Sequence, residues 1–132
     1  MKKTFTLVEI MIVVAIIALL ASIAIPNLLR YRVSSHDAAV KRDLHTLIFA
    51  IESYAAATGL YPTNTSVLVG ENPPYLNEDF TNRIRKGYNI TCSPMSTSSY
   101  TCTALPDVCM RTGSKNYTVT TGAVWAETDC TP

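Results

Sequence analysis

The sequence predicts an α+β protein in which a long N-terminal helix packs on a C-terminal antiparallel sheet of about four strands. Three observations predict this class: an apolar run over residues 5–26, a helical repeat of apolar residues that continues to about residue 58, and an alternating pattern after Gly87. Helices repeat their apolar positions every three or four residues, whereas strands alternate. The change of period therefore separates a helical part from a sheet part.

The apolar run, FTLVEIMIVVAIIALLASIAIP, has the length of a membrane-spanning helix. Residues 10–25 carry no charge, and with residues 5–8 the run reaches the ~20 residues that cross a bilayer. The alternative is a signal peptide or plain signal anchor that begins with Lys2 and Lys3. The apolar core of a signal peptide is only about 7–15 residues, and this run is longer and contains an acid. We therefore expect a transmembrane helix over residues 5–27.

Glu9 is the acid in that run. An ionised carboxylate near hydrocarbon costs several kcal/mol unless it is paired or reaches the membrane surface. Glu9 lies four residues from Phe5, so its side chain reaching back to the surface is one interpretation. Glutamine or serine would reach the surface at lower cost, which favours a partner for Glu9.

Residues 28–58 are predicted to be an amphipathic helix of a head domain. Gly59 is a natural helix end, and Pro62 follows it. Pro26 lies inside the helical pattern, where it breaks a hydrogen bond to residue 22 and so kinks or locally melts the helix, or merely bends it at the membrane surface. The apolar positions recur at mostly three- and four-residue steps: Leu29, Val33, Val40, Leu44, Leu47, Ile48, Ile51 and Tyr54.

The remainder is predicted to be a connecting loop over residues 59–87 and a sheet region over residues 88–132. The loop is rich in proline and asparagine, with a short helical turn expected near residues 76–84. A sheet with one apolar face needs a cover, which the apolar stripe of the helix supplies. We expect Trp125 to be a core or subunit-contact residue rather than a ligand stacker. Alternation predicts four strands, near residues 88–92, 100–102, 117–119 and 124–126, with turns at residues 93–99 and 121–122.

A short basic leader, FTLVE, an apolar helix, AIPN and an amphipathic continuation that ends in YP follow one another up to Pro62. In this order they resemble the class III signal and N-terminal helix of type IV pilins and type II secretion pseudopilins. The segment RYRVSSHDAAVKRDLHTLIFAIESYAAATGLYP is most similar to pilins of the type IVa kind, and beyond Pro62 the likeness is architectural. The resemblance implies a pilus subunit for adhesion, twitching motility or DNA uptake, with a pseudopilin of type II secretion as the alternative.

The resemblance also implies roles for individual residues. Residues 1–4 would be a leader that a prepilin peptidase removes between Thr4 and Phe5, although the family has Gly where this chain has Thr4. Either the leader is retained or processing tolerates Thr. The freed amine of Phe5 would be N-methylated and would pair with Glu9 of a neighbouring subunit, and the helix around Pro26 would be unwound in assembled pili. Small residues would let the helices of the filament core approach closely: Ala15, Ala18, Ala21, Ser22 and Ala24.

The implied partners are further copies of this chain, the bacterial inner membrane before assembly, the prepilin peptidase and the pilus assembly machinery. The implied final location is an extracellular filament. A monomeric membrane-anchored domain is expected instead if Thr4 blocks cleavage. Electron conduction is a further interpretation, disfavoured because only 8% of residues are aromatic; it would use Phe5, Tyr31, Phe49, Tyr54 and Tyr61.

Four cysteines lie in the last third of the chain, which indicates an oxidising compartment and disulfides with three possible pairings. Cys92 and Cys102 flank a turn and would face each other across a hairpin. We therefore expect Cys92–Cys102 and Cys109–Cys130, with Cys92–Cys130 as the alternative pairing. A zinc site is disfavoured because there is no Cys-x2-Cys pair and the two histidines, His36 and His45, lie far away on the helix.

Composition and motifs argue against other classes of function. The net charge is +1 and becomes −1 without Lys2 and Lys3, so no basic field predicts a nucleic-acid partner. We find no G-x-S-x-G, P-loop or H-E-x-x-H pattern and expect no catalytic residue, metal or cofactor. Asp107, Glu127 and Asp129 are scattered, which is weak support for a calcium site. Three Asn-x-Ser/Thr sequons could carry glycans: Asn64, Asn89 and Asn116.

Overall fold

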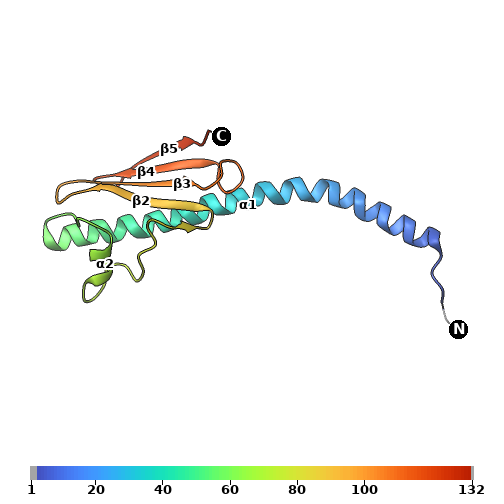
Figure 1. Cartoon of the computed structure of the whole chain (residues 1–132), viewed down its shortest axis with the longest axis horizontal. Helices are drawn as coiled ribbons and strands as arrows, with labels where there is room; N and C mark the ends of the chain where they lie inside the picture. The colour runs from blue at the N-terminus through green and yellow to red at the C-terminus, as the bar shows by residue number, and fades with distance from the viewer. Residues whose placement is uncertain (1–2, 132) are drawn as a thin grey trace. The chain divides into compact units, whose positions relative to one another are not determined.

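The computed structural model describes residues 3–131 of the chain, which divides into two units, Met1–Arg32 and Val33–Pro132. The predicted α+β class is confirmed, since the chain forms a long helix and an antiparallel sheet (Figure 1). The elements are α1 (Leu7–Thr58), α2 (Ser66–Gly70), β1 (Ile84–Arg85), β2 (Tyr88–Met95), β3 (Tyr100–Pro106), β4 (Lys115–Thr120) and β5 (Val124–Asp129).

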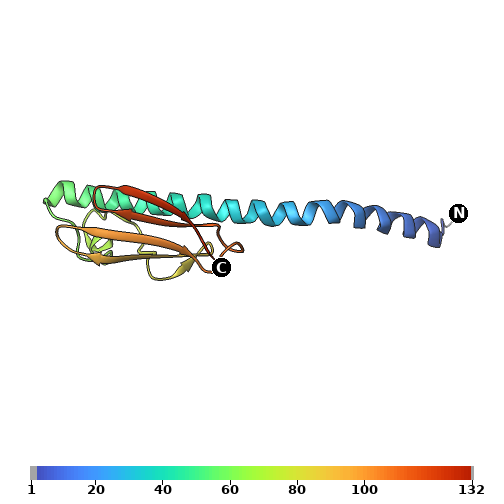
Figure 2. The ribbon, with the colours of Figure 1, turned by 90° about the horizontal axis from the view of Figure 1, so that it is seen from above.

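Helix α1 covers one face of the sheet in the second unit (Figure 2). Its apolar stripe is buried there much as predicted, although Val33 and Tyr54 are only half-buried and Leu29, in the first unit, is 58% exposed. The helix ends where expected: Gly59 has φ +79, a left-handed conformation that glycine adopts without strain. The helix residues of the core are Val40, Leu44, Leu47, Ile48, Ala50 and Ile51.

The sheet has five strands in the order β1-β2-β3-β4-β5, all antiparallel to their neighbours. The prediction of four strands missed β1, because a strand of two residues is too short to show alternation. The expected turn after Cys92 also begins later, since β2 continues to Met95 through an irregularity in its pairing with β3. Trp125 packs against the core, as expected, and its ring lies 4.3 Å from that of His45.

The connecting loop holds a short helix, but not at the predicted place. The apolar spacing of Leu76 and Phe80 mimics a helical turn, yet the structure has no helix over residues 76–84, and both side chains are buried from an irregular backbone. Helix α2 forms earlier, where the Oδ1 atom of Asn64 accepts a hydrogen bond from the Val67 N–H (3.1 Å). A side-chain acceptor before a short helix satisfies a backbone donor that the helix leaves free.

Asp37 fastens α1 to the sheet near the start of the second unit. Its Oδ1 atom accepts hydrogen bonds from the Tyr88 hydroxyl (2.6 Å) and the Ser114 N–H (3.0 Å), and its Oδ2 atom accepts one from the Ser114 hydroxyl. Burial of the ring and the bond to Asp37 raise the pKa of Tyr88 above its ordinary value. Gly113 is required here, because a Cβ atom would lie 2.1 Å from the Tyr88 hydroxyl oxygen.

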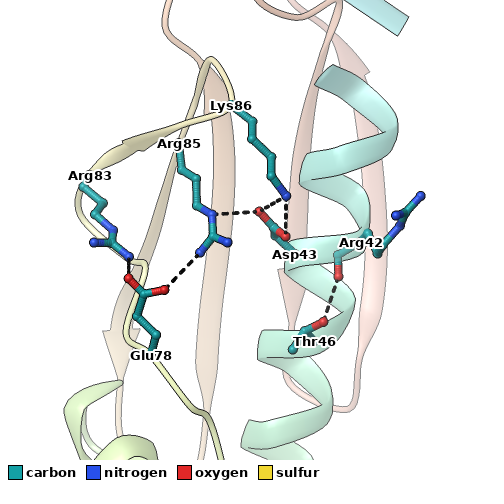
Figure 3. Close-up of polar contacts among 7 residues, drawn as sticks. All are labelled: Arg42, Asp43, Thr46, Glu78, Arg83, Arg85 and Lys86. Carbon is teal, nitrogen blue, oxygen red and sulfur yellow. Dashed lines mark hydrogen bonds and ion pairs between the residues drawn. The ribbon is translucent and has the colours of Figure 1, made fainter. Parts of the chain in front are cut away.

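Exposed ion pairs join the connecting loop to α1 (Figure 3). Lys86 Nζ lies 3.1 Å from Asp43, and Arg85 lies between Asp43 (3.6 Å) and Glu78 (3.7 Å). Arg83 also pairs with Glu78, and this hydrogen bond lowers the pKa of the Glu78 carboxyl. Because exposed pairs typically contribute less than ~1 kcal/mol each, we assign them to positioning the loop rather than to stability.

Asp79 links two parts of the connecting loop through its carboxylate. It accepts hydrogen bonds from the Thr81 N–H (3.0 Å) and hydroxyl (2.7 Å) and from the Thr65 hydroxyl (2.8 Å), and both threonines are buried. Burial acts to raise the pKa of Asp79, but these hydrogen bonds outweigh it and leave the pKa below its ordinary value. The ionised form is therefore the one that the fold prefers.

Replacing Asp79 with alanine is expected to lower the free energy of unfolding by about 1–2 kcal/mol at pH 7. A lowered pKa in the folded state stabilises above the unfolded pKa, so the contribution should be present above pH ~4 and lost as the pH falls below ~4. Thermal unfolding of the full chain in detergent, followed at pH 7 and pH 3, measures both effects. Asp129→Ala is the matched control, since Asp129 is exposed and makes no side-chain hydrogen bond or ion pair among the described residues. An equal loss from the two variants would contradict the assignment.

The structure contains two disulfides, Cys92–Cys102 and Cys109–Cys130. The first joins directly paired residues of β2 and β3, and the second ties the C-terminal end to the loop after β3. Non-reducing peptide mapping of protein isolated from cells is expected to recover these two cross-linked peptides. Recovery of a peptide that joins Cys92 to Cys109 or to Cys130 would overturn the pairing.

Candidate assembly site

The first unit presents an apolar helix with almost nothing covering it. Every large apolar side chain from Phe5 to Leu29 is at least half exposed, from 50% at Ile10 to 81% at Phe5. One stretch of α1 is long and apolar enough to cross a membrane, by length and composition. Exposed apolar surface on this scale is stable only when lipid or other protein covers it.

Thr6 and Glu9 close the start of α1 with a reciprocal pair of hydrogen bonds. The Glu9 Oε2 atom accepts from the Thr6 N–H (2.7 Å) and hydroxyl (2.8 Å), and the Thr6 oxygen accepts from the Glu9 N–H (3.2 Å). This is a capping box, in which a Thr before the helix and a Glu three residues later satisfy each other's free backbone donors. The carboxylate of Glu9 is therefore held at the helix start.

The capping box leaves part of the Glu9 carboxylate available. Both of its bonds fall on Oε2, and Oε1 receives no hydrogen bond from residues 3–131. A carboxylate can accept several hydrogen bonds, so a cation can bind Oε1 while Thr6 still holds Oε2. Thr6 is thus the site residue that the prediction missed, although the spacing Thr-x-x-Glu before an apolar run would have revealed it.

The other N-terminal residues of the predicted site lie just before α1. Thr4 and Phe5 precede the helix, and Glu9 bonds to Thr6 rather than to Phe5 within the chain. Met1 and Lys2, which belong to the expected leader, lie outside the described residues.

Helix α1 passes through Pro26 without interruption in the single chain. Two side chains bond to backbone carbonyls around it: the Ser22 hydroxyl donates to Leu19 O (2.7 Å), and the Asn27 amide donates to Ile23 O (3.2 Å). Pro26 lacks the N–H that would bond the Ser22 carbonyl, and these two side-chain bonds fall on other carbonyls of the same stretch. Unwinding at Pro26 thus stays a prediction for the assembled state.

Several of the remaining candidate residues have local partners. His36 donates from Nδ1 to the Thr112 carbonyl (3.0 Å), and Glu127 pairs with Lys41 and Lys115. Asn64 uses its side chain at α2, whereas Asn89 and Asn116 are half-buried on strands. Among the aromatic residues considered for conduction, Tyr54 contacts Tyr75, Tyr61 contacts Tyr100 and Phe49 is 76% exposed.

Comparison with known proteins gives matches to components of surface filaments and of a secretion system. No family model matches the chain. It is 40% identical over 67 residues to the type IV wide pilus major component PilA4 of Thermus thermophilus, a match of 51% of each chain. It is 44% identical over 60 residues to the type IV major pilin protein PilA of Myxococcus xanthus, or 46% of this chain and 27% of that one.

A third relative is the type II secretion system core protein G of Klebsiella pneumoniae. It is 37% identical over 62 residues, which cover 47% of this chain and 44% of that protein. The matches therefore span about half or less of the curated relatives' length.

Proposed function

We propose that this chain, a type IV pilin-like protein, is a structural subunit of a type IV pilus that polymerises through residues 5–27 into an extracellular filament. The observation that carries the proposal is the apolar first unit, in which every large side chain is at least half exposed. Burying one such aliphatic side chain fully contributes about 1.5–3 kcal/mol. Parallel packing of many copies of this helix supplies that burial once the subunit leaves the bilayer. Adhesion, twitching motility and DNA uptake are the activities that such a filament would serve.

Glu9 supplies the register of this packing. In the proposal, the Oε1 atom of Glu9 binds the amine of Phe5 on a neighbouring subunit, while Thr6 retains Oε2. Two charges that would be costly alone in an apolar core then compensate each other, and the pair fixes the axial position of one helix against the next. A contact that repeats head to tail without closing produces a helical fibre rather than a ring.

The proposal requires a free amine at Phe5. A prepilin peptidase would cut after Thr4 in the inner membrane, the amine would be N-methylated, and the assembly machinery would then extract the subunit into the filament. Unwinding of α1 around Pro26 would lengthen the subunit during this step. The proposed partners are thus other copies of the chain, the membrane and these processing and assembly proteins.

A pseudopilin of type II secretion, which helps export other proteins, is the second candidate. The match to a type II secretion core protein G supports it. Two disulfides in a domain of this size favour the pilus, because such bonds suit a subunit that is exposed outside the cell for long periods.

Electron microscopy of cells that express the chain separates the two candidates. We expect long surface filaments that are labelled by antibodies against the second unit and are absent when the coding sequence is deleted. The opposite result would be normal expression with only short periplasmic assemblies, and a block in protein export when the coding sequence is deleted. That result would show that the chain acts in secretion and not as a pilus subunit.

A further inference from the structure

The face of the sheet that α1 does not cover carries no charge. Directly paired residues of antiparallel strands share a face, so the registers of the strand pairs divide the strand residues between the two sides. The four charged strand residues lie on the helix side, with the buried residues Tyr88 and Tyr117. Arg85 is paired with Tyr88 and Glu127 with Tyr117, and the pair Lys115–Asp129 lies two residues further along β4 and β5, on the same side. A solvent-facing sheet surface normally carries such residues, so this distribution is inverted.

Threonine dominates the uncovered side, which we call the neutral face. Thr103 is paired with Thr91 on one side and with Thr118 on the other, and Thr118 is paired with Ala126. A second row joins Thr101 to Thr120. The threonines of this face are Thr91, Thr101, Thr103, Thr118, Thr120 and Thr128.

Exposed apolar side chains gather at the edges of the neutral face. Asn89 is paired with both Ile84 and Leu105, so these two apolar residues lie on the neutral face. Val124 lies on the same face because it is paired with Thr120. These three side chains are 60%, 49% and 62% exposed, respectively. Asn89 and Asn116 also lie on this face, so the surface is uncharged and combines threonine and asparagine side chains with exposed aliphatic residues.

We propose that the neutral face binds the neutral face of a subunit in a neighbouring filament, so that filaments associate side by side. Two copies can meet here without repulsion, since no like charges face each other. The charges of the strands remain on the helix side, where Glu127 is paired with Lys41 and Lys115.

The neutral face is too small for two single subunits to bind each other stably. Five strands spaced ~4.8 Å apart, with six residues in each of β4 and β5 at ~3.3 Å per residue, give a face of roughly 500 Å². A stable protein interface buries ~800 Å² on each partner. Single subunits are therefore expected to stay apart, whereas an array of them binds through many weak contacts at once. The inference rests on the proposed function, because the filament supplies that array.

Liposomes that carry the full chain at high density test the contact without requiring filaments. Clustering is followed by light scattering for the unmodified chain, Thr118→Lys and Thr118→Glu. We expect the unmodified chain to cluster the liposomes, and each variant to reduce clustering by at least about tenfold. Mixing liposomes of the two variants should restore clustering, because Lys then faces Glu, and this recovery also shows that both variants fold.

Thr46→Lys is the matched control, because Thr46 is exposed on α1 and is not part of the neutral face. Liposomes that stay dispersed with the unmodified chain, or an equal loss from Thr46→Lys, would overturn the proposal. Clustering only after a neutral polysaccharide is added would assign the face to glycans and overturn it as well. Clustered liposomes from a chain that never forms filaments in cells would instead refute the pilus function.

Discussion

Replacing Glu9 with valine is expected to reduce the number of subunits in sheared filaments by at least ~100-fold while the amount in the membrane stays unchanged. The incoming or neighbouring amine of Phe5 would then be buried without a counter-charge, and leaving one partner of a buried pair alone costs about 3–5 kcal/mol. Since ~1.4 kcal/mol corresponds to a tenfold change in an equilibrium constant, the loss exceeds a hundredfold. Quantitative immunoblots of the sheared and membrane fractions measure the ratio.

Three further variants make this result specific. Glu9→Gln retains the size of the side chain and removes the charge, so it should also fail to assemble. Thr6→Ala removes the capping box alone, which is worth about 1 kcal/mol, so its yield should fall much less. Glu71→Gln, a change at an exposed carboxylate of the second unit, should assemble normally. A normal filament yield from Glu9→Val would contradict the proposed pairing of Glu9 with the Phe5 amine.

Deleting residues 5–27 is expected to convert the protein into a soluble, folded monomer that forms no filaments. A chain that starts near Leu29 keeps the part of α1 whose apolar stripe is buried under the sheet, including Val40 and Leu44. The polar fastening of the helix through Asp37, Tyr88 and Ser114 is also retained. Ultracentrifugation in oxidising buffer measures the association state, and circular dichroism measures the fold.

The deletion needs a control for folding, because an unfolded chain would also fail to assemble. Gly113→Ala in the shortened chain serves this purpose, since its added Cβ collides with Tyr88 and should reduce the cooperative unfolding transition. A shortened chain that unfolds cooperatively and still forms fibres would show that the second unit drives assembly. The N-terminal helix would then be only an anchor.

The features that the sequence predicted best were patterns that extend over many residues. The apolar repeat that buries Val40, Leu44 and Ile48 persists over many turns, so both the helix and the face that it buries could be predicted. Alternation around Tyr88 and Tyr117 likewise revealed the strands of the sheet that bury these side chains. Short elements were harder to predict, since β1 has only two residues and the start of α2 is marked by one side-chain acceptor, Asn64.

Only part of the candidate site could be predicted from the sequence. The cost of an acid in an apolar run singled out Glu9, but its partner Thr6 lies in the same turn and was not recognised as a capping residue. The remaining partner in the proposal, the amine of Phe5, belongs to another subunit. No pattern within one chain reports such a contact directly, because periodicity describes what a segment buries and not what it meets after assembly.

The mass of the N-terminal peptide of subunits in sheared filaments tests the central claim most directly. The account predicts a chain that begins at Phe5 and carries a methylated amine, since only a free amine at that position can pair with Glu9 of a neighbour. Filament subunits that begin at Met1 would contradict it, because the nitrogen of Phe5 would then be an uncharged amide.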